Sequence, residues 1–174
     1  TSGGKPLMQA LNDRQTGREY STERLSLQVL SNLLWAANGV NRPDGRRTAP
    51  SALNLQEIDV YLVVSDGIFL YDAKGNILKQ IVAEDLRALT GKQPFVKDAP
   101  INLVYVADLS KMSKLTPKDA ERYSNADTGF ISQNVYLFCA SEGLVTVIRD
   151  LIDKPVLSKA MKLKNNQQII LAQT

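Results

Sequence analysis

The chain has 174 residues, of which 44% are hydrophobic and 22% charged, and this composition predicts one folded domain spanning residues 1–174. It has no His and a single Cys, which excludes Ser-His-Asp and Cys-His catalysis, the common zinc sites and a disulfide within the chain. Its net charge of +3 is too balanced for a dedicated nucleic-acid-binding protein, so no nucleic-acid partner is expected. No run approaches the roughly 18 consecutive apolar residues of a membrane span. The chain opens at Thr1 rather than Met, which indicates a processed or trimmed N-terminus and leaves the compartment, cytoplasmic or periplasmic, open.

Two helices are predicted in the N-terminal part. Residues 6–13 begin with a Pro in the first turn and carry apolar side chains at helical spacing. Ser26 is the expected N-cap of a second helix over residues 27–38, which Gly39 is expected to end. Trp35 is expected to anchor the core or a dimer interface rather than stack on a ligand. The predicted apolar stripe of the second helix comprises Leu27, Leu30, Leu34 and Ala37, with Leu33 beside it.

Five later segments have the pattern of β-strands. In residues 58–64 apolar side chains recur at every second position, as in a strand. Residues 68–71 and 77–82 flank Asp72-Ala-Lys-Gly-Asn76, whose Gly and Asn favour the positive φ of a hairpin turn. Residues 101–107 are nearly all apolar, which is typical of a strand covered on both faces, and residues 169–172 form the last expected strand.

Three further helices are predicted between and after these strands. Residues 83–89 predict a short helix that Gly91 closes. A long helix is expected to begin after Thr116, its N-cap, and to extend to residue 142, and a short helix is expected over residues 155–161. Because helices and strands mix without a regular βαβ alternation, the expected fold class is α+β rather than a doubly wound parallel sheet.

The first candidate binding element is Arg14-Gln15-Thr16-Gly17-Arg18, which follows the first predicted helix. Two guanidinium groups and a hydroxyl within five residues can donate charge-assisted hydrogen bonds to one phosphate, and the backbone N–H groups of Gln15 and Gly17 add to them. The alternative is a solvated basic helix end that favours the helix dipole and binds no ligand.

The second candidate is Pro50-Ser51-Ala52-Leu53-Asn54-Leu55-Gln56, directly before the first predicted strand. Its Ser, Asn and Gln side chains can match the hydrogen-bonding edge of a heterocycle. Such side chains also cap turns, and on the residues alone this alternative is favoured. The nearby arginines, Arg42, Arg46 and Arg47, are expected to lie in a solvated loop.

A third candidate follows the long helix. Gly143 is its expected C-cap, and the apolar extended stretch after it leaves backbone N–H groups free to contact a ligand. A plain connection from helix to strand is the alternative. No G-x-G-x-x-G or G-x-x-x-x-G-K-S run is present, so the sequence does not support a Rossmann or P-loop nucleotide site.

Other reactive residue types have structural interpretations. Asp119, Glu121 and Asp127 are expected at the capped, solvated start of the long helix rather than as general acids. Cys139 lies between apolar neighbours, which predicts a buried thiol rather than a nucleophile. No metal site is therefore expected.

Taken together, these segments resemble the nitroreductase family of FMN-dependent oxidoreductases over nearly the whole chain. The closest resemblance is to its azoline-oxidising (SagB/ThcOx-type) dehydrogenase subgroup. Arg14, Thr16 and Arg18 match the family's Arg-x-Ser-x-Arg/Lys signature for the flavin phosphate, with Thr in place of Ser. The family's Pro-Ser-x-x-Asn-x-Gln motif is matched in register by Pro50, Ser51, Asn54 and Gln56.

Two further motifs extend the resemblance into the second half of the chain. Asp127-x-Gly129 with Gln133-Asn134 resembles the family's central-helix pattern. Gly143-Leu144-Val145-Thr146 resembles Gly-Leu-Gly-Thr, with Val145 in place of Gly. The chain stops at Thr174, whereas the family often carries a further tail with phosphate-binding Lys or Arg, so a lower affinity for FMN is expected.

The resemblance implies an α+β sandwich, with a central antiparallel sheet flanked by helices, in an intertwined homodimer with two FMN sites at the interface. It implies hydride transfer through FMN from NAD(P)H or an organic donor to a nitroaromatic, quinone or similar acceptor, by a ping-pong mechanism. No side chain need act as acid or base. The alternative is a non-catalytic protein of the same fold that binds a flavin or another phosphate ligand. The FMN-binding residues that the resemblance implies, with Ser51 and Asn54 reaching in from the partner chain, are Arg14, Gln15, Thr16, Arg18, Pro50, Ser51, Ala52, Asn54, Gln56, Val147, Ile148 and Arg149.

Overall fold

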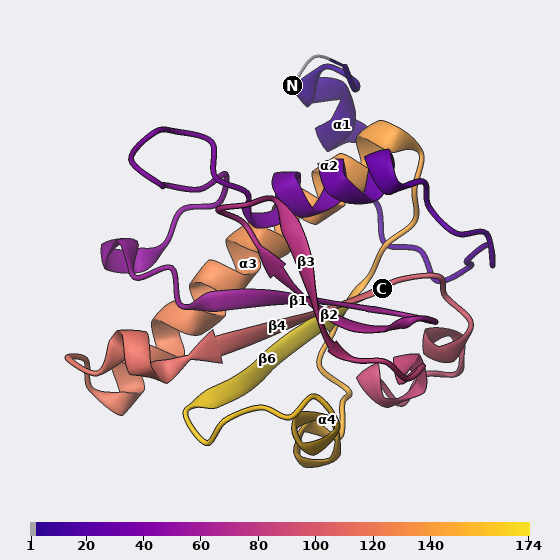
Figure 1. Ribbon diagram of the computed structural model, residues 1–174. Helices are drawn as coiled ribbons and strands as arrows, with labels where there is room; N and C mark the ends of the chain where they lie inside the picture. The colour runs from indigo at the N-terminus through magenta and orange to yellow at the C-terminus, as the bar shows by residue number, and fades with distance from the viewer. Residues whose placement is uncertain (1–2) are drawn as a thin grey trace.

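A computed structural model describes residues 3–174 and places one six-stranded sheet between two layers of helices (Figure 1). The strands lie in the order β3-β2-β1-β4-β6-β5, and every neighbouring pair is antiparallel. Each predicted strand is present, and the short β5 is an addition; the expected α+β class with a central antiparallel sheet is confirmed. The strands are β1 Ile58–Val64, β2 Gly67–Asp72, β3 Ile77–Val82, β4 Asn102–Asp108, β5 Ile148–Arg149 and β6 Gln167–Gln173.

The helices divide between the two faces of the sheet. The α-helices are α1 Leu7–Asp13, α2 Leu27–Asn38, α3 Pro117–Glu142 and α4 Lys154–Ala160. The short 3₁₀ helices are η1 Ala52–Asn54, η2 Arg87–Thr90, η3 Pro94–Lys97 and η4 Leu109–Met112. Helices α2 and α3 cover one face, and α4 lies against the other (Figure 1). Among residues 3–174, no helix has the length and apolarity that would let it cross a bilayer.

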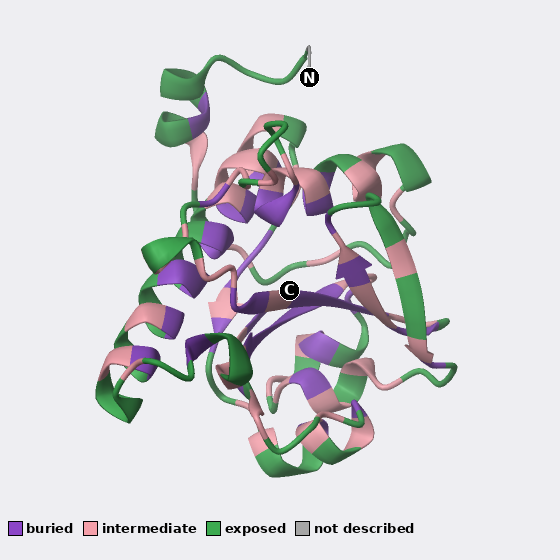
Figure 2. Ribbon diagram, turned by 60° about the vertical axis from the view of Figure 1, so that its left-hand side comes forward, coloured by how far each residue is buried: buried purple, intermediate pink, exposed green. Residues whose placement is uncertain are grey.

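The alternation of side chains along β1 builds both halves of the core. Val60 and Leu62 face the α2–α3 layer, where they join a cluster that includes Ile131. Tyr61 lies on the opposite face, in a second cluster with Leu157 of α4. Because a fully buried aliphatic side chain contributes about 1.5–3 kcal/mol, both clusters hold the sheet in place. Figure 2 shows this burial as purple ribbon on the sheet and on the helix faces turned toward it.

Side-chain and glycine caps set the helix ends that the sequence predicts. The Ser26 hydroxyl accepts a hydrogen bond from Val29 N at 3.3 Å, and the Thr116 hydroxyl accepts one from Asp119 N at 3.2 Å. Gly143 ends α3 with φ 71°, a left-handed conformation that favours glycine. The predicted bounds of α2 and α3 are therefore confirmed.

The buried stripe of α2 follows the prediction except at Leu27, its first member. Leu27 is 83% exposed, while Leu33, Leu34 and Ala37 are buried. Periodicity thus identifies both the helix and its buried face, whereas Leu27 in the first turn lies beyond the part of α2 that the core covers.

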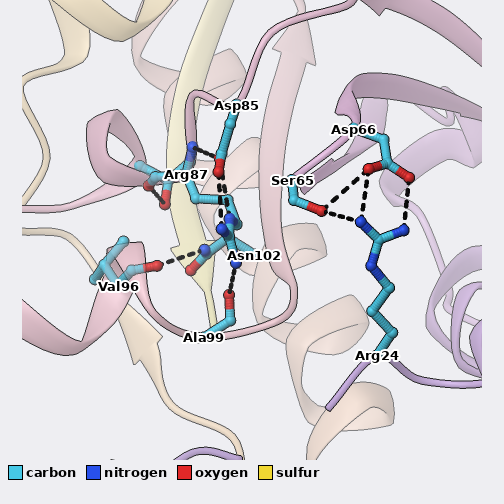
Figure 3. A network of polar contacts seen from close by, with 9 residues as sticks. Arg24, Ser65, Asp66, Asp85, Arg87, Val96, Ala99 and Asn102 are labelled. Carbon is cyan, nitrogen blue, oxygen red and sulfur yellow. Dashed lines mark hydrogen bonds and ion pairs between the residues drawn. The ribbon is translucent and has the colours of Figure 1, made fainter. Parts of the chain in front are cut away.

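The predicted helix over residues 83–89 is wrong, since only residues 87–90 are helical there, as the 3₁₀ helix η2. The Asp85 carboxylate accepts a hydrogen bond from Arg87 N at 3.2 Å and pairs with the Arg87 guanidinium at 2.8 Å. Such a local contact competes with α-helical hydrogen bonding. Arg87 Nη1 also donates to the Ala99 carbonyl at 3.0 Å, which links η2 to the connection between η3 and β4 (Figure 3).

Candidate functional site

The segment Arg14–Arg18, called here the basic segment, leaves the end of α1 without regular secondary structure. Neither Arg14 nor Arg18 forms an ion pair with any residue among 3–174. The adjacent Asp13 is already paired with Lys5 Nζ at 2.8 Å, which lowers the pKa of its carboxyl. Two unpaired guanidinium groups and the exposed Thr16 hydroxyl therefore lie within five residues, which is the donor set that a phosphate needs.

Tyr136, buried on α3, connects the basic segment to β5. Its hydroxyl accepts a hydrogen bond from Ile148 N at 3.0 Å and lies 3.1 Å from Thr16 Oγ1. The Arg14 Cζ atom lies 5.4 Å from the centre of the Tyr136 ring, within cation–π range. The sequence patterns missed this residue; the one available signal is that a buried Tyr hydroxyl needs a polar partner.

Gly17 and Val145 are in close contact where the basic segment crosses the irregular segment that leads into β5. Gly17 N donates to the Thr146 carbonyl at 3.2 Å, and a Cβ added at Gly17 would lie 2.5 Å from Val145 Cγ1. Glycine at position 17 is thus required by the close approach of Val145. The valine that replaces the glycine of the related motif is accommodated by this contact.

A pocket of about 470 Å³ lies between the basic segment and the C-terminal end of α3. Its lining includes Arg14, Gln15, Gly17, Tyr136, Cys139 and Val145. Burial raises the pKa of the Cys139 thiol to about 12, and the predicted burial of this thiol is confirmed.

The backbone around β5 is already hydrogen-bonded within the chain. Val147 N donates to the Thr174 carbonyl at 3.1 Å, and Ile148 N donates to the Tyr136 hydroxyl. The expectation that these amides are free for a ligand is therefore wrong, because the end of β6 and the α3 tyrosine take them.

The Arg149 side chain has a structural role. It is 5% exposed and donates to the Thr174 hydroxyl, the Thr90 carbonyl and the Asn102 side chain at 2.8–2.9 Å. Burial lowers the pKa of its guanidinium to about 10. The Asn102 amide donates in turn to the Val96 carbonyl at 3.0 Å, so Arg149 joins β4, η2 and η3 (Figure 3 shows the Asn102 contact).

The second candidate, residues 51–56, is called here the 51–56 loop. Ser51 Oγ accepts a hydrogen bond from Gln56 N at 2.8 Å, and the Gln56 amide donates to Asn54 Oδ1 at 3.1 Å. These side chains thus cap their own turn, as the alternative interpretation expects. The Arg47 guanidinium donates to Gln56 Oε1 at 3.0 Å and is half-buried, so it does not lie in a solvated loop.

The backbone of the 51–56 loop is strained. Leu53, Asn54 and Gln56 have φ values of 53°, 55° and 50°, a conformation that costs non-glycine residues about 1–3 kcal/mol each. Leu53 and Asn54 nonetheless point their side chains into solvent. Strain of this kind persists only where the surroundings hold it, and it often marks a functional segment.

Two buried acids accept hydrogen bonds from the 51–56 loop on its side toward the core. Asp127 on α3 is 2% exposed, and its Oδ2 accepts a hydrogen bond from Ala52 N at 2.8 Å. The Glu57 side chain is fully buried, and its Oε2 accepts one from the Ser51 hydroxyl at 3.3 Å. Burial, together with the nearby Asp127 carboxylate, raises the pKa of Glu57. The expectation that Asp127 is solvated is therefore wrong, whereas Asp119 serves the helix cap as predicted.

The basic segment and the 51–56 loop lie on opposite sides of the molecule (Figure 1). The basic segment contacts α3 at Tyr136, and the 51–56 loop contacts it at Asp127. These positions are about 13 Å apart along the helix, given a rise of about 1.5 Å per residue. Within one chain, the structure brings Arg14, Thr16 and Ile148 together and keeps Ser51 and Asn54 apart from them.

Comparison with known proteins connects this arrangement to one family. A curated Methanocaldococcus jannaschii protein named as a nitroreductase is 33% identical over 151 residues, which cover 81% of this chain and 76% of the relative. A crystal structure from Ralstonia eutropha JMP134, also named as a nitroreductase, is 42% identical, with a TM-score of 0.96 over all of this chain and 83% of that one.

A third similarity includes the cofactor. A Desulfovibrio desulfuricans protein solved in complex with FMN and named as a nitroreductase shares the fold, with a TM-score of 0.70 and 21% identity over 98% of this chain and 84% of that one. The model of the Nitroreductase family matches residues 11–174. The chain therefore belongs to the nitroreductase family, whose members are generally FMN-dependent oxidoreductases.

Proposed function

We propose that this chain takes hydride from NAD(P)H or an organic donor and delivers it to a nitroaromatic, quinone or similar acceptor through bound FMN. The observation that carries this proposal is the pair of unpaired guanidinium groups beside the Thr16 hydroxyl, at the edge of a pocket of about 470 Å³. The four sequence motifs also favour the azoline-oxidising subgroup within the family.

The residues around the basic segment fit the phosphate end of FMN. Arg14, Thr16 and Arg18 would hold the phosphate by charge-assisted hydrogen bonds, with the backbone of Gln15 beside them. Residues Val147–Arg149 would line the site as a rigid wall, since two of their amides are fixed by contacts within the chain.

For the ring end of the site we propose a second copy of the chain. Because the 51–56 loop lies on the opposite side of the molecule from the basic segment, we assign it to the partner's flavin, as the family resemblance implies (Figure 1). The loop residues in this role are Pro50, Ser51, Ala52, Asn54 and Gln56. Of these, Asn54 has an exposed side chain, and the hydrogen bond from the Gln56 amide fixes the turn that carries it.

Exposed apolar side chains support the proposed homodimer. Leu7, Met8 and Leu11 of α1 are all exposed, and α1, which packs against α3 at one end of the molecule, is drawn mostly in green (Figure 2). Leu27 of α2 and Phe130 of α3 are exposed as well. Apolar surface of this kind is covered when two copies associate.

FMN, when bound, supplies the hydride chemistry, and the protein positions it and its substrates. Three titratable groups near the basic segment and β5, namely Tyr20, Cys139 and Arg149, keep one protonation state near neutral pH. Burial raises the pKa of Tyr20 to about 12, as it does for Cys139, and Arg149 remains a cation. Protons that accompany reduction would therefore come from solvent or from the substrate.

A second candidate function is binding of flavin without turnover. It is favoured by one observation, namely that the amides of Val147 and Ile148 are engaged within the chain and cannot also donate to a flavin ring. In this alternative the protein binds flavin in order to sequester or sense it and does not transfer hydride.

Anaerobic reduction distinguishes the two functions. FMN added to the purified protein should bind, bleach on addition of NADH or NADPH, and recover its absorbance when a nitroaromatic or quinone is added. Initial rates should give parallel double-reciprocal lines, because donor and acceptor use one pocket in turn. Bound FMN that neither nucleotide nor organic donors reduce would support the non-catalytic alternative, and failure to bind FMN would exclude both.

A further inference from the structure

Glu57 and Asp127 form a buried acidic pair for which the proposed chemistry has no use. Glu57 directly precedes β1 and is completely buried, and Asp127 faces it from the middle of α3. Both carboxyl groups contact the start of the 51–56 loop, Glu57 through the Ser51 hydroxyl at 3.3 Å and Asp127 through the adjacent Ala52 amide at 2.8 Å. Glu57 Oε1 has no hydrogen-bond partner among residues 3–174.

No described cation compensates these two acids. Lys111 of η4 donates to the Gln56 carbonyl at 3.0 Å and pairs with Asp59 of β1 at 3.2 Å. Arg47 contacts the Gln56 side chain, and the backbone N–H of Asp108, at the end of β4, donates to the Glu57 carbonyl at 2.9 Å. The basic groups packed around the 51–56 loop therefore bind other acceptors.

Two carboxylates in one buried space without a cation cannot both carry charge at modest cost. Asp127 Oδ2 already has a backbone donor, the Ala52 N–H at 2.8 Å. Glu57 has only the Ser51 hydroxyl as a side-chain donor, at 3.3 Å, and its second oxygen is unpartnered. A proton on Glu57 would supply the missing donor between the two acids.

We propose that Glu57 and Asp127 hold a single proton between them and that this protonated pair positions the 51–56 loop. The pair holds Ser51 and Ala52 by hydrogen bonds. These two residues begin the turn in which Leu53, Asn54 and Gln56 adopt positive φ. Loss of the proton would place two negative charges in the core and release the loop. The consequence for the cofactor rests on the proposed function, since it requires the loop to contact the partner's FMN.

The direction of the pH effect follows from the Glu57 shift. An unfolded Glu titrates near 4.5, and the folded-state pKa of Glu57 lies above that value. Stability from this group is fully present below pH 4.5 and is lost as the pH rises through the folded-state pKa. The 51–56 loop should thus loosen as the solution becomes more alkaline.

Hydrogen exchange on the FMN-free protein tests the pair directly. Protection factors of the Ala52 and Gln56 amides should fall as the pH rises, by about ten-fold for each unit by which the folded-state pKa of Glu57 exceeds 4.5. Infrared spectroscopy should show a protonated carboxyl band that persists above the pH at which exposed acids ionise. Glu57→Gln should remove both the band and the pH dependence, whereas Glu121→Gln, at an exposed position of α3, should leave both unchanged.

Constant protection of Ala52 and Gln56 across the titration, or a spectrum without such a band, would overturn the proposal. These two measurements need only the unmodified protein, so they decide the question even where Glu57→Gln does not fold. FMN titrations at the same pH values test the link to the cofactor separately. Loop protection that changes with pH while FMN affinity stays constant would keep the proton-sharing pair and reject the loop's role in the flavin site.

Discussion

The basic segment and the 51–56 loop differ in how their polar groups are satisfied. In the basic segment, the Arg14 and Arg18 guanidinium groups have no acidic partner among residues 3–174, and the segment is held mainly through Tyr136 and the Gly17 backbone. In the 51–56 loop, side chains bond to the loop itself and two buried acids hold it. Unpaired donors, as in the basic segment, suit a charged ligand that supplies hydrogen-bond acceptors. A turn whose polar groups are already hydrogen-bonded, as in the 51–56 loop, suits recognition of a flat ring by shape.

The largest expected effect is the loss of FMN affinity when the unpaired arginines of the basic segment are removed. Replacing both Arg14 and Arg18 by Ala removes two charge-assisted contacts worth about 1.5–3 kcal/mol each, so FMN affinity should fall by about 100-fold or more. Arg18→Ala alone should weaken binding by roughly ten-fold or more. Quenching of flavin fluorescence measures both, with Arg122→Ala, an exposed arginine on α3, as the control. Unchanged affinity in the double variant would remove the phosphate site from the basic segment.

Removing the Asp127 contact to the 51–56 loop should lower the stability of the protein. Asp127→Ala leaves the Ala52 N–H without its acceptor, which should lower the free energy of unfolding by about 1–3 kcal/mol. Asp127→Asn keeps an amide oxygen at this position, so it should lose less. Urea denaturation measures both variants. Equal losses would show that the Ala52 contact does not hold the loop.

One substitution should disrupt the packing of Gly17 against Val145, and a second should restore it. Gly17→Ala places a Cβ 2.5 Å from Val145 Cγ1, and overpacking of this kind destabilises by about 1–3 kcal/mol. Adding Val145→Ala removes the clashing methyl group, because Val145 Cβ lies 3.7 Å from the new atom. Thermal or urea unfolding of the double variant should show recovery relative to Gly17→Ala. Simple addition of the two losses would mean that the residues do not contact each other.

Mixing of variants tests whether the two regions meet across a dimer. Light scattering should report about twice the chain mass of 19.2 kDa. In a dimer of one Arg18→Ala chain and one Asn54→Ala chain, one site carries both changes and the other carries none. Unfolding and refolding of the mixture should therefore restore tight FMN binding to a fraction of sites. No tight sites in the mixture, although each variant folds and dimerises, would place both regions in a site within one chain.

The smallest effect is expected at acids near the basic segment. Glu142→Gln and Asp150→Asn should each leave the turnover number within about ten-fold, since losing a true general acid or base costs about 10²–10⁴-fold. Steady-state rates with a nitroaromatic or quinone acceptor measure this, with flavin absorbance as the check on loading. A loss of about 10³-fold in a variant that still holds FMN would assign that acid to proton transfer.

Local chemistry explains which elements were predictable. The caps of α2 and α3 and the alternation along β1 arise from neighbouring residues, and the structure follows them. The helix over residues 83–89 was wrong because Asp85 and Arg87 bond to each other and Arg87 bonds to Ala99, a residue distant in the sequence. The free amides expected at Val147 and Ile148 were wrong because Thr174 and Tyr136 reach them from other elements.

The sequence by itself determined the α+β class, the main helix caps, the buried state of Cys139 and the family resemblance, because each depends on residue type and short-range order. Only the tertiary structure decided that Tyr136 connects Thr16 to β5, that Gly17 accommodates Val145, and that Glu57 and Asp127 both contact the 51–56 loop. These contacts join residues far apart along the chain. Their partners are selected by the packing of α3 against the sheet, which no local pattern encodes.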